Sequence, residues 1–262
     1  GDDGQGVTAQ VTATVSDGSK SRSSSATVTV TILPSLSAVI VLSSSMTQVK
    51  MNPGDSLRLT GSVSAPSELS SNVTWSLDGS SSSLVDLKSI ALTPLTQSYG
   101  VIPASSILLQ RTVYLALPGN VLPAGVTYTF SLTCSLSSPG KTSSSSISIA
   151  VNKAPTPGLL QISPSSGGEE LSTMFFFSCS DWEDEDLPLT YVFGYVSSRG
   201  QKMNIRTRGE TPSSSSTLPA GQKKNGGDGK QMLAGIAQVY DSYLANSYVE
   251  NEVEVKEKTV VM

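Results

Sequence analysis

The sequence predicts an all-β protein made of tandem β-sandwich domains of the immunoglobulin-like or fibronectin-III-like kind. Apolar and hydroxyl side chains alternate with a period of two residues over several stretches, as they do in half-buried strands. The same strand–turn–strand unit also recurs at intervals of a little over 100 residues, which is the size of one sandwich domain. No segment sustains the period of an amphipathic helix.

The first strand–turn–strand unit lies near the beginning of the chain. Apolar residues alternate with hydroxyl residues from Val11 to Val15 and again from Ala26 to Ile32. Asp17-Gly18 lies between these runs and is a strong hairpin signal when β-branched strands flank it. We interpret residues 1–33 as the C-terminal hairpin of a sandwich domain whose earlier strands lie outside this sequence.

Two further copies of the unit close two complete domains. The second copy runs from Thr127 to Val151, and the third runs from Gly235 to Val255 around a turn at Asp241–Ala245. We therefore expect one sandwich at 35–152 and another, of the type described below, at 155–258. The proline-containing junctions before these domains are interpreted as stiff linkers and lie at 33–35 and 152–158.

Composition excludes several classes of function. The chain has no histidine, on which catalytic triads, many general bases and zinc sites depend. Charged residues make up 15%, against roughly 25% in ordinary globular proteins, and the net charge is -4. Such a chain lacks the clustered Lys and Arg that bind phosphates, so we expect no nucleic-acid partner. We also expect no enzyme and no organic cofactor; a glycosidase with two loop carboxylates serves only as a contrast.

Serine makes up roughly a fifth of the chain, and hydroxyl-rich surfaces are typical of secreted, sugar-bearing proteins. The longest apolar run, Ala38–Leu42, has the length of a strand and not of a membrane span. We therefore expect an extracellular or cell-surface protein, whose attachment to a membrane would lie outside this chain.

Individual residues suggest a core position and sites of glycosylation. Trp75 is expected to be a core tryptophan, with ligand stacking as the alternative. Asn72-Val73-Thr74 is the one Asn-x-Ser/Thr sequon in the sequence. Asn72, Thr211 and Ser213 are therefore the candidate glycosylation positions.

The two cysteines, Cys134 and Cys179, fall in different predicted domains. Within one sandwich, two cysteines on such strands would bridge the sheets, but here a bridge would have to join two domains. We expect buried free thiols, with a disulfide to a partner outside this chain as the alternative.

An acidic loop leads into the aromatic strand at 189–196. Its acidic residues are Asp181, Glu183, Asp184, Glu185 and Asp186. Asp181, Asp184 and Asp186 are candidate Ca²⁺ ligands, although no EF-hand spacing is present. A nearby Lys or Arg, or backbone N–H groups, could offset the repulsion instead. We expect Trp182 and Leu187 to anchor the loop while the acids point to solvent.

Around this loop the sequence resembles a known module. The segments that carry the resemblance are Pro155–Gly167, Thr173–Trp182 with its Cys-x-x-Trp, and Asp184–Phe193 with its acidic-Leu-Pro-Leu-x-Tyr-x-Phe. They are similar to the REJ (receptor for egg jelly) module found in ectodomains of polycystin-1-type and sperm egg-jelly receptors. The resemblance is close over 155–195 and is one of architecture elsewhere. It implies fibronectin-III-like sandwiches in series, no catalysis, and a cell-surface or ciliary setting. The serine runs depart from animal members and indicate a protist or algal source.

Two functions fit these observations. The chain could be part of an extracellular cell-surface, ciliary or flagellar glycoprotein that binds ligand, mediates adhesion or acts as a mechanical scaffold. It could instead be a structural subunit of an extracellular glycosylated fibre, such as a flagellar hair or glycofibril, because hydroxyl-rich strands with little charge suit a sugar-coated polymer. The expected partners are other extracellular domains or glycans, together with copies of the chain itself in a fibre.

Overall fold

The protein is almost entirely β-structure, as the sequence predicts. The computed structural model describes residues 7–16, 23–32, 37–79, 83–102, 108–138, 140–223 and 229–258. Within these ranges the helix α1 (Leu87–Ile90) is one turn long, with Asp86 as its N-cap. Among the described residues there is no helix with the length and apolar character needed to cross a membrane.

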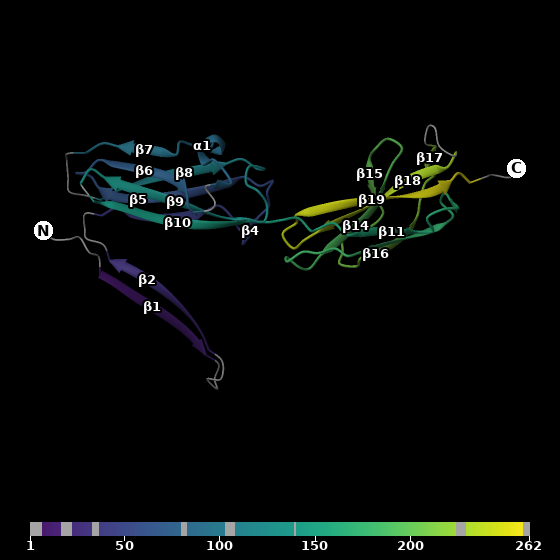
Figure 1. Cartoon of the computed structure of the whole chain (residues 1–262), viewed down its shortest axis with the longest axis horizontal. Helices are drawn as coiled ribbons and strands as arrows, with labels where there is room; N and C mark the ends of the chain where they lie inside the picture. The colour runs from purple at the N-terminus through teal and green to yellow at the C-terminus, as the bar shows by residue number, and fades with distance from the viewer. Residues whose placement is uncertain are drawn as a thin grey trace. The chain divides into compact units, whose positions relative to one another are not determined.

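The first two strands form a hairpin of their own. β1 (Val7–Ser16) pairs antiparallel with β2 (Ser23–Ile32), and Val11 lies opposite Val28 (Figure 1). The side chains of Val11 and Val28 are 60% and 62% exposed. The predicted hairpin is confirmed, while its Asp17-Gly18 turn and the junction 33–35 lie outside the described residues.

The first sandwich consists of a small and a large sheet (Figure 1). The small sheet has the order β3 (Val39–Ser44), β5 (Leu57–Pro66), β8 (Leu108–Leu117). The large sheet has the order β4 (Lys50–Met51), β10 (Thr142–Val151), β9 (Thr127–Leu136), β6 (Ser71–Leu77), β7 (Thr96–Tyr99). β4 is short and pairs in parallel with the last two residues of β10.

The second sandwich has the same strand order. Its small sheet is β11 (Leu159–Ser163), β13 (Met174–Ser180), β16 (Ser213–Thr217). Its large sheet is β12 (Gly168–Glu169), β19 (Asn246–Lys256), β18 (Gln231–Tyr240), β14 (Thr190–Val196), β15 (Lys202–Asn204), with β17 (Gln222–Lys223) also on β18. β12 pairs in parallel with the end of β19, as β4 does with β10. Both copies are therefore sandwiches of the immunoglobulin-like type.

The chain forms two compact units that do not follow the strands strictly. The second unit contains Gln48–Asp55 and Leu122–Val126 in addition to the chain from Ala150 onward. Residues 152–158, interpreted from the sequence as a stiff linker, are part of this unit, and Asn152 and Pro155 within them are buried.

Each core lies between the two sheets and includes a glycine where the sheets come close. A Cβ at Gly61 on β5 would overlap the side chain of Leu132 on β9. In the second sandwich, a Cβ at Gly235 on β18 would overlap Ile162 on β11. A larger residue at either glycine would force the sheets apart.

The predicted core residues are buried. Trp75 on β6 is 2% exposed and lies opposite Leu132, which confirms it as a core tryptophan. Phe193 on β14 is fully buried, and its ring packs edge-on against Phe177 with 6.0 Å between centroids. The predicted strand 189–196 therefore contributes to the second core through Leu189 and its centre, 192–194, while its other residues are partly exposed.

Cys134 on β9 and Cys179 on β13 are buried free thiols. Burial raises the pKa of the Cys134 thiol and raises the pKa of the Cys179 thiol to about 11. Neither forms an appreciable amount of thiolate at neutral pH, so both behave as small apolar core residues.

Replacing Trp75 with alanine should destabilise the first sandwich by about 3–5 kcal/mol, because the truncation leaves a cavity in a close-packed core. Urea unfolding followed by circular dichroism measures the change. Tyr114→Ala is the control, since Tyr114 is 49% exposed on β8 and its loss should cost less than about 1 kcal/mol. A cost below about 1 kcal/mol for Trp75→Ala would contradict the core role.

Candidate functional site

The acidic loop connects β13 to β14 and is fixed at both ends. Thr156 and Glu183 form a two-residue bridge, in which the Thr156 N–H donates to the Glu183 carbonyl at 2.9 Å. At the other end, Leu189 is buried at the start of the aromatic strand. Asp181 has a positive φ of 60° and an exposed side chain that accepts from the Ser180 hydroxyl.

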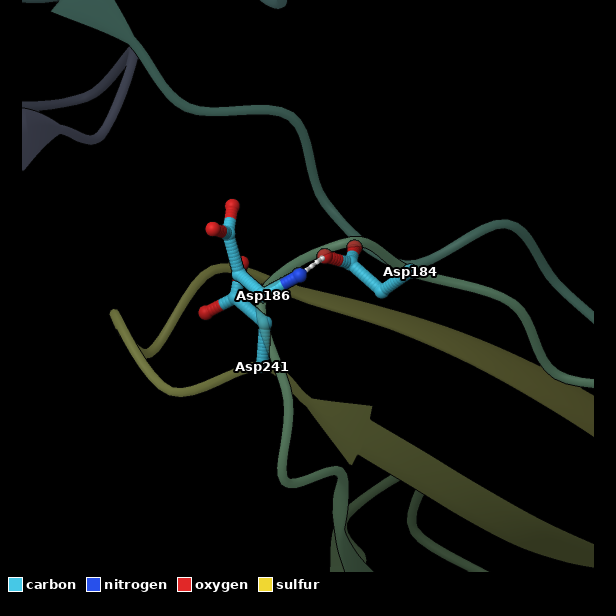
Figure 2. Close-up of side chains that lie close together, drawn as sticks. All are labelled: Asp184, Asp186 and Asp241. Carbon is cyan, nitrogen blue, oxygen red and sulfur yellow. Dashed lines mark hydrogen bonds between the residues drawn. The ribbon is translucent and has the colours of Figure 1, made fainter. Parts of the chain in front are cut away.

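Three carboxylates come together at this loop. Asp184, Asp186 and Asp241 each place an oxygen within 4.8 Å of the others. Figure 2 shows the first two on the loop and Asp241 at the end of β18, with the Asp186 N–H donating to Asp184 Oδ1 at 2.7 Å. Asp181, a candidate ligand from the sequence, is not part of this group.

Asp241 is held by the turn between β18 and β19. It is 1% exposed, and its Oδ1 accepts from the backbone N–H groups of Tyr243 and Ala245 at 2.8 and 2.9 Å. Its Oδ2 accepts from Asn152 Nδ2 at 2.6 Å. This is the pattern of an aspartate that caps a tight turn.

Lys50 supplies the positive charge. Its Nζ lies 2.8 and 2.7 Å from the two carboxylate oxygens of Asp186 and 2.6 Å from Glu185 Oε1. The Lys50 and Asp186 side chains are 21% and 12% exposed, so water screens their pairing only in part. Glu185 is 81% exposed, so its own pairing is weak.

Two asparagines connect the neighbouring segments. Asn152 is 1% exposed, and its Nδ2 also donates to Asn52 Oδ1 at 3.0 Å. Asn52 Nδ2 in turn donates to the Tyr243 carbonyl at 2.8 Å. We call the set Lys50, Asn52, Asn152, Asp186 and Asp241 the aspartate network; all five residues belong to the second compact unit.

The charges of the site act on one another. The hydrogen bonds that Lys50 donates to Asp186 and Glu185 raise the pKa of Lys50 above its ordinary value. The hydrogen bond from Lys50 lowers the pKa of Glu185. Partial burial, aided by the charges of Asp241 and Asp186, raises the pKa of Asp184, although the backbone bond from Asp186 opposes this. The repulsion between the carboxylates is therefore least offset at Asp184.

A cleft of about 540 Å³ lies beside the loop. Its lining residues are Gly125, Lys153, Ala154, Thr156, Glu183, Asp184 and Glu185. The lining contains three acidic residues, Glu183, Asp184 and Glu185, and one basic residue, Lys153. The cleft therefore suits a small polar or cationic group better than an anion.

The structure corrects the expected anchoring of the loop. Trp182 packs against the second core, as expected, but Leu187 is 66% exposed and Leu189 takes its place in the core. The acids also do not all point to solvent, because Lys50 offsets the charge of Asp186. Sequence reasoning missed Lys50 and Asp241. Asp241 could have been found, since this loop and the turn after β18 lie at the same end of an immunoglobulin-like sandwich.

A model of the REJ domain matches residues 4–261. The chain belongs to the REJ family. The match extends well beyond 155–195, where the sequence resemblance is close, and it includes the first sandwich. REJ membership identifies the chain as an extracellular receptor-type module and groups it with non-catalytic structural modules.

The comparison with solved structures found two segments of titin among its matches. One, a crystal structure of consecutive titin domains, has 11% identity and a TM-score of 0.42, with 97% of this chain and 75% of that chain covered. The other is a crystal structure of titin domains Z1Z2 in complex with telethonin. It has 12% identity and a TM-score of 0.29, and the match covers 83% of this chain and 98% of that chain. No curated protein matched the REJ chain.

The residues that carry the REJ resemblance hold the second core together. Cys179 is buried, and Trp182 packs against the core cluster. Tyr191 and Phe193 stack with 6.4 Å between ring centroids. The cysteine and the aromatic residues of the motif therefore help to specify the fold of the module.

The candidate glycosylation positions are all exposed. Thr211 precedes β16, and Ser213 begins it, with the Ser213 carbonyl accepting from Arg206 at 2.8 Å. Both line a second cleft of about 500 Å³ together with Phe176, which is 59% exposed. Asn72 lies on β6, on the outer side of the large sheet of the first sandwich.

The outer side of that sheet carries hydroxyl side chains and one amide. Its outward positions are Asn72, Thr74 and Ser76 on β6, Thr96 and Ser98 on β7, Thr127, Thr129, Ser131, Thr133 and Ser135 on β9, and Thr142, Ser144, Ser146 and Ser148 on β10. The intervening residues of β9, among them Tyr128 and Phe130, are fully buried, as strand alternation requires. We call this surface the hydroxyl face.

Calcium should leave the thermal stability of the protein unchanged. A Ca²⁺ ion needs six to eight oxygen ligands, whereas Asp241 is already bound by N–H donors and Asp186 by Lys50. Melting curves in chelator and in millimolar CaCl2 test this. A clear rise in the melting temperature with Ca²⁺ would show that the ion displaces Lys50 and would restore the carboxylates as metal ligands.

Proposed function

We propose that this chain is a non-catalytic, load-bearing scaffold segment of a cell-surface, ciliary or flagellar ectodomain. In this role its sandwiches hold other extracellular domains or glycans in place. The observation that carries the proposal is the aspartate network, in which Lys50 binds Asp186 while Asn152 binds Asp241 and Asn52.

The carboxylates of Asp186 and Asp241 already accept hydrogen bonds from within the protein, which argues for a structural role. Both Asp186 oxygens accept from Lys50, and both Asp241 oxygens accept from N–H donors. A catalytic or binding carboxylate must offer lone pairs to a substrate, and these two have few left. The network instead ties together chain segments that lie far apart in the sequence, since Lys50 and Asp186 are 136 residues apart.

The position of the aspartate network in the chain suits it to resist a pulling force. Residues Lys50–Met51 run parallel to Ala150–Val151, and the Asn152 N–H donates to the Met51 carbonyl at 2.7 Å. A pull on the two ends of the chain draws these parallel segments in opposite directions, so their hydrogen bonds are loaded together in shear. The ion pair to Asp186 adds a side-chain tie to the same segment.

Single-molecule pulling on the chain should show a lower unfolding force for Lys50→Met than for wild type. The substitution keeps the aliphatic stem but removes the charge that holds Asp186, and it leaves this mostly buried carboxylate unpaired. Lys153→Met is the matched control, since Lys153 is exposed and affects Glu185 only through its charge. Identical force distributions for Lys50→Met and wild type would overturn the load-bearing role of the network.

A fibre subunit is the second candidate, and the hairpin β1–β2 favours it. Exposed valines lie on this two-stranded sheet, including the cross-strand pair Val11 and Val28. An uncovered apolar sheet is a surface that another chain can pair with or cover.

Sedimentation of the chain over a range of concentrations separates the two functions. A fibre subunit should self-associate, and Val11→Lys with Val28→Lys should abolish this because buried lysines would oppose packing. A chain that remains monomeric at all concentrations would exclude assembly through the hairpin and leave the scaffold function in place.

A further inference from the structure

We propose that Asn72 carries an N-linked glycan and that this glycan lies over the hydroxyl face of the first sandwich. The proposal rests on the membership of the chain in an extracellular module family. It goes beyond the scaffold function, because it assigns a modification site and says which surface the sugar covers.

Asn72 meets the local requirements of an acceptor. It begins the sequon Asn72-Val73-Thr74, and its side chain is exposed on the outer side of β6. Its Oδ1 accepts from the Ser98 hydroxyl at 3.1 Å, which orients the amide. The Nδ2 atom, which would carry the sugar, makes no hydrogen bond to a described residue. Val73 between them is buried, so alternation sends both Asn72 and Thr74 outward.

The neighbours of Asn72 leave room for a sugar. Ser98 on β7 and Ser135 on β9 lie directly opposite Asn72 in the sheet. Both are short side chains, and the next pair of positions, Thr74 and Thr96, is similarly short. No long or charged side chain projects from the outward positions of the hydroxyl face, so the first sugars can approach the sheet closely.

The chemistry of the face matches that of a glycan. Each hydroxyl offers one donor and two acceptors, as the hydroxyls of a sugar do. Adjacent side chains already pair with each other, as Thr129 and Ser148 do at 2.9 Å and Thr74 and Thr96 at 3.2 Å. One carboxylate, that of Asp78, lies at the edge of this face and accepts from the Ser131 hydroxyl. The strand positions themselves carry neither charge nor large apolar side chains, so the face offers little to a protein partner, but it can exchange its hydrogen bonds with a carbohydrate lying along it.

The donor is a lipid-diphosphate-linked oligosaccharide. Nδ2 of Asn72 bonds to C1 of the first sugar, and the bond from C1 to the diphosphate oxygen breaks. The lipid diphosphate leaves with the electron pair, and one amide proton is lost to the transferring enzyme's base.

Mass spectrometry of the full chain secreted from a eukaryotic cell tests the modification. We expect the intact mass to exceed the 27.2 kDa polypeptide by an oligosaccharide. Enzymatic release of the glycan in heavy-oxygen water should convert Asn72 to labelled aspartate. Asn72→Gln and Thr74→Ala should both lose this sugar, whereas Thr74→Ser should keep it because serine also completes the sequon. An unmodified Asn72 peptide in the secreted wild-type chain would overturn the proposal.

Thiol labelling tests the position of the glycan. The two native cysteines are buried, so a cysteine introduced at exposed Ser144, two strands from Asn72, can be labelled selectively. That position lies roughly 10 Å across the sheet from Asn72, within reach of a glycan. Glycan removal should speed labelling of Ser144→Cys several-fold and leave Val41→Cys unchanged, since Val41 is exposed on the small sheet.

The two parts of the proposal fail separately. A glycosylated Asn72 with no change in the labelling of Ser144→Cys would overturn the covering of the hydroxyl face. Loss of wild-type sugar from Thr or Ser residues after alkaline elimination, with Asn72 unmodified, would show an O-glycosylated face instead. Neither result would bear on the aspartate network, which lies in the second unit.

Discussion

The constraint on which the structure depends is that a β-strand sends successive side chains to opposite faces. In β9, Tyr128, Phe130 and Leu132 are fully buried while the residues between them face outward. Where one face of a strand is committed to the core, as in β9, a shift of register by one residue would place serines and threonines in the core, so the pairing of such strands is strongly specified. The same alternation creates the core, fixes the register and leaves an outer surface of hydroxyl groups.

A surface of this kind changes how the protein stays soluble. With only 15% charged residues, the chain relies on neutral hydroxyl groups for hydration, and little electrostatic self-repulsion opposes its compact state. A dense group of charges forms where Lys50, Asp184, Glu185 and Asp186 meet. There the cost of bringing carboxylates together is offset by a lysine and by backbone N–H groups, within the same unit of the fold.

The alternation is a local signal, which explains what sequence could and could not predict. The hairpins, the burial of Trp75 and the aromatic strand at 189–196 follow from residues close together in the chain. The pairing of Lys50 with Asp186, and of Asn152 with Asp241, joins residues 136 and 89 positions apart, and no local pattern shows which residues pair. The exposure of Leu187 was also not predictable, because Leu187 and Leu189 are equally apolar and alternation would send both to the same face. Only Leu189 directly precedes β14 and enters the core, while Leu187 stays in the loop.

The two cysteines lie one in each sandwich, so neither sandwich contains a covalent bridge between its sheets. A domain held by a disulfide keeps a closed loop when it unfolds and releases only part of its length. These sandwiches, when pulled open, release their full contour length, at roughly 3.5 Å per residue or on the order of 300 Å for a domain of this size. Opening also brings a protonated, sheltered thiol into water, where its pKa returns toward that of free cysteine and it can react. Mechanical opening of either sandwich would thus expose a single cysteine, Cys134 or Cys179, to chemical modification.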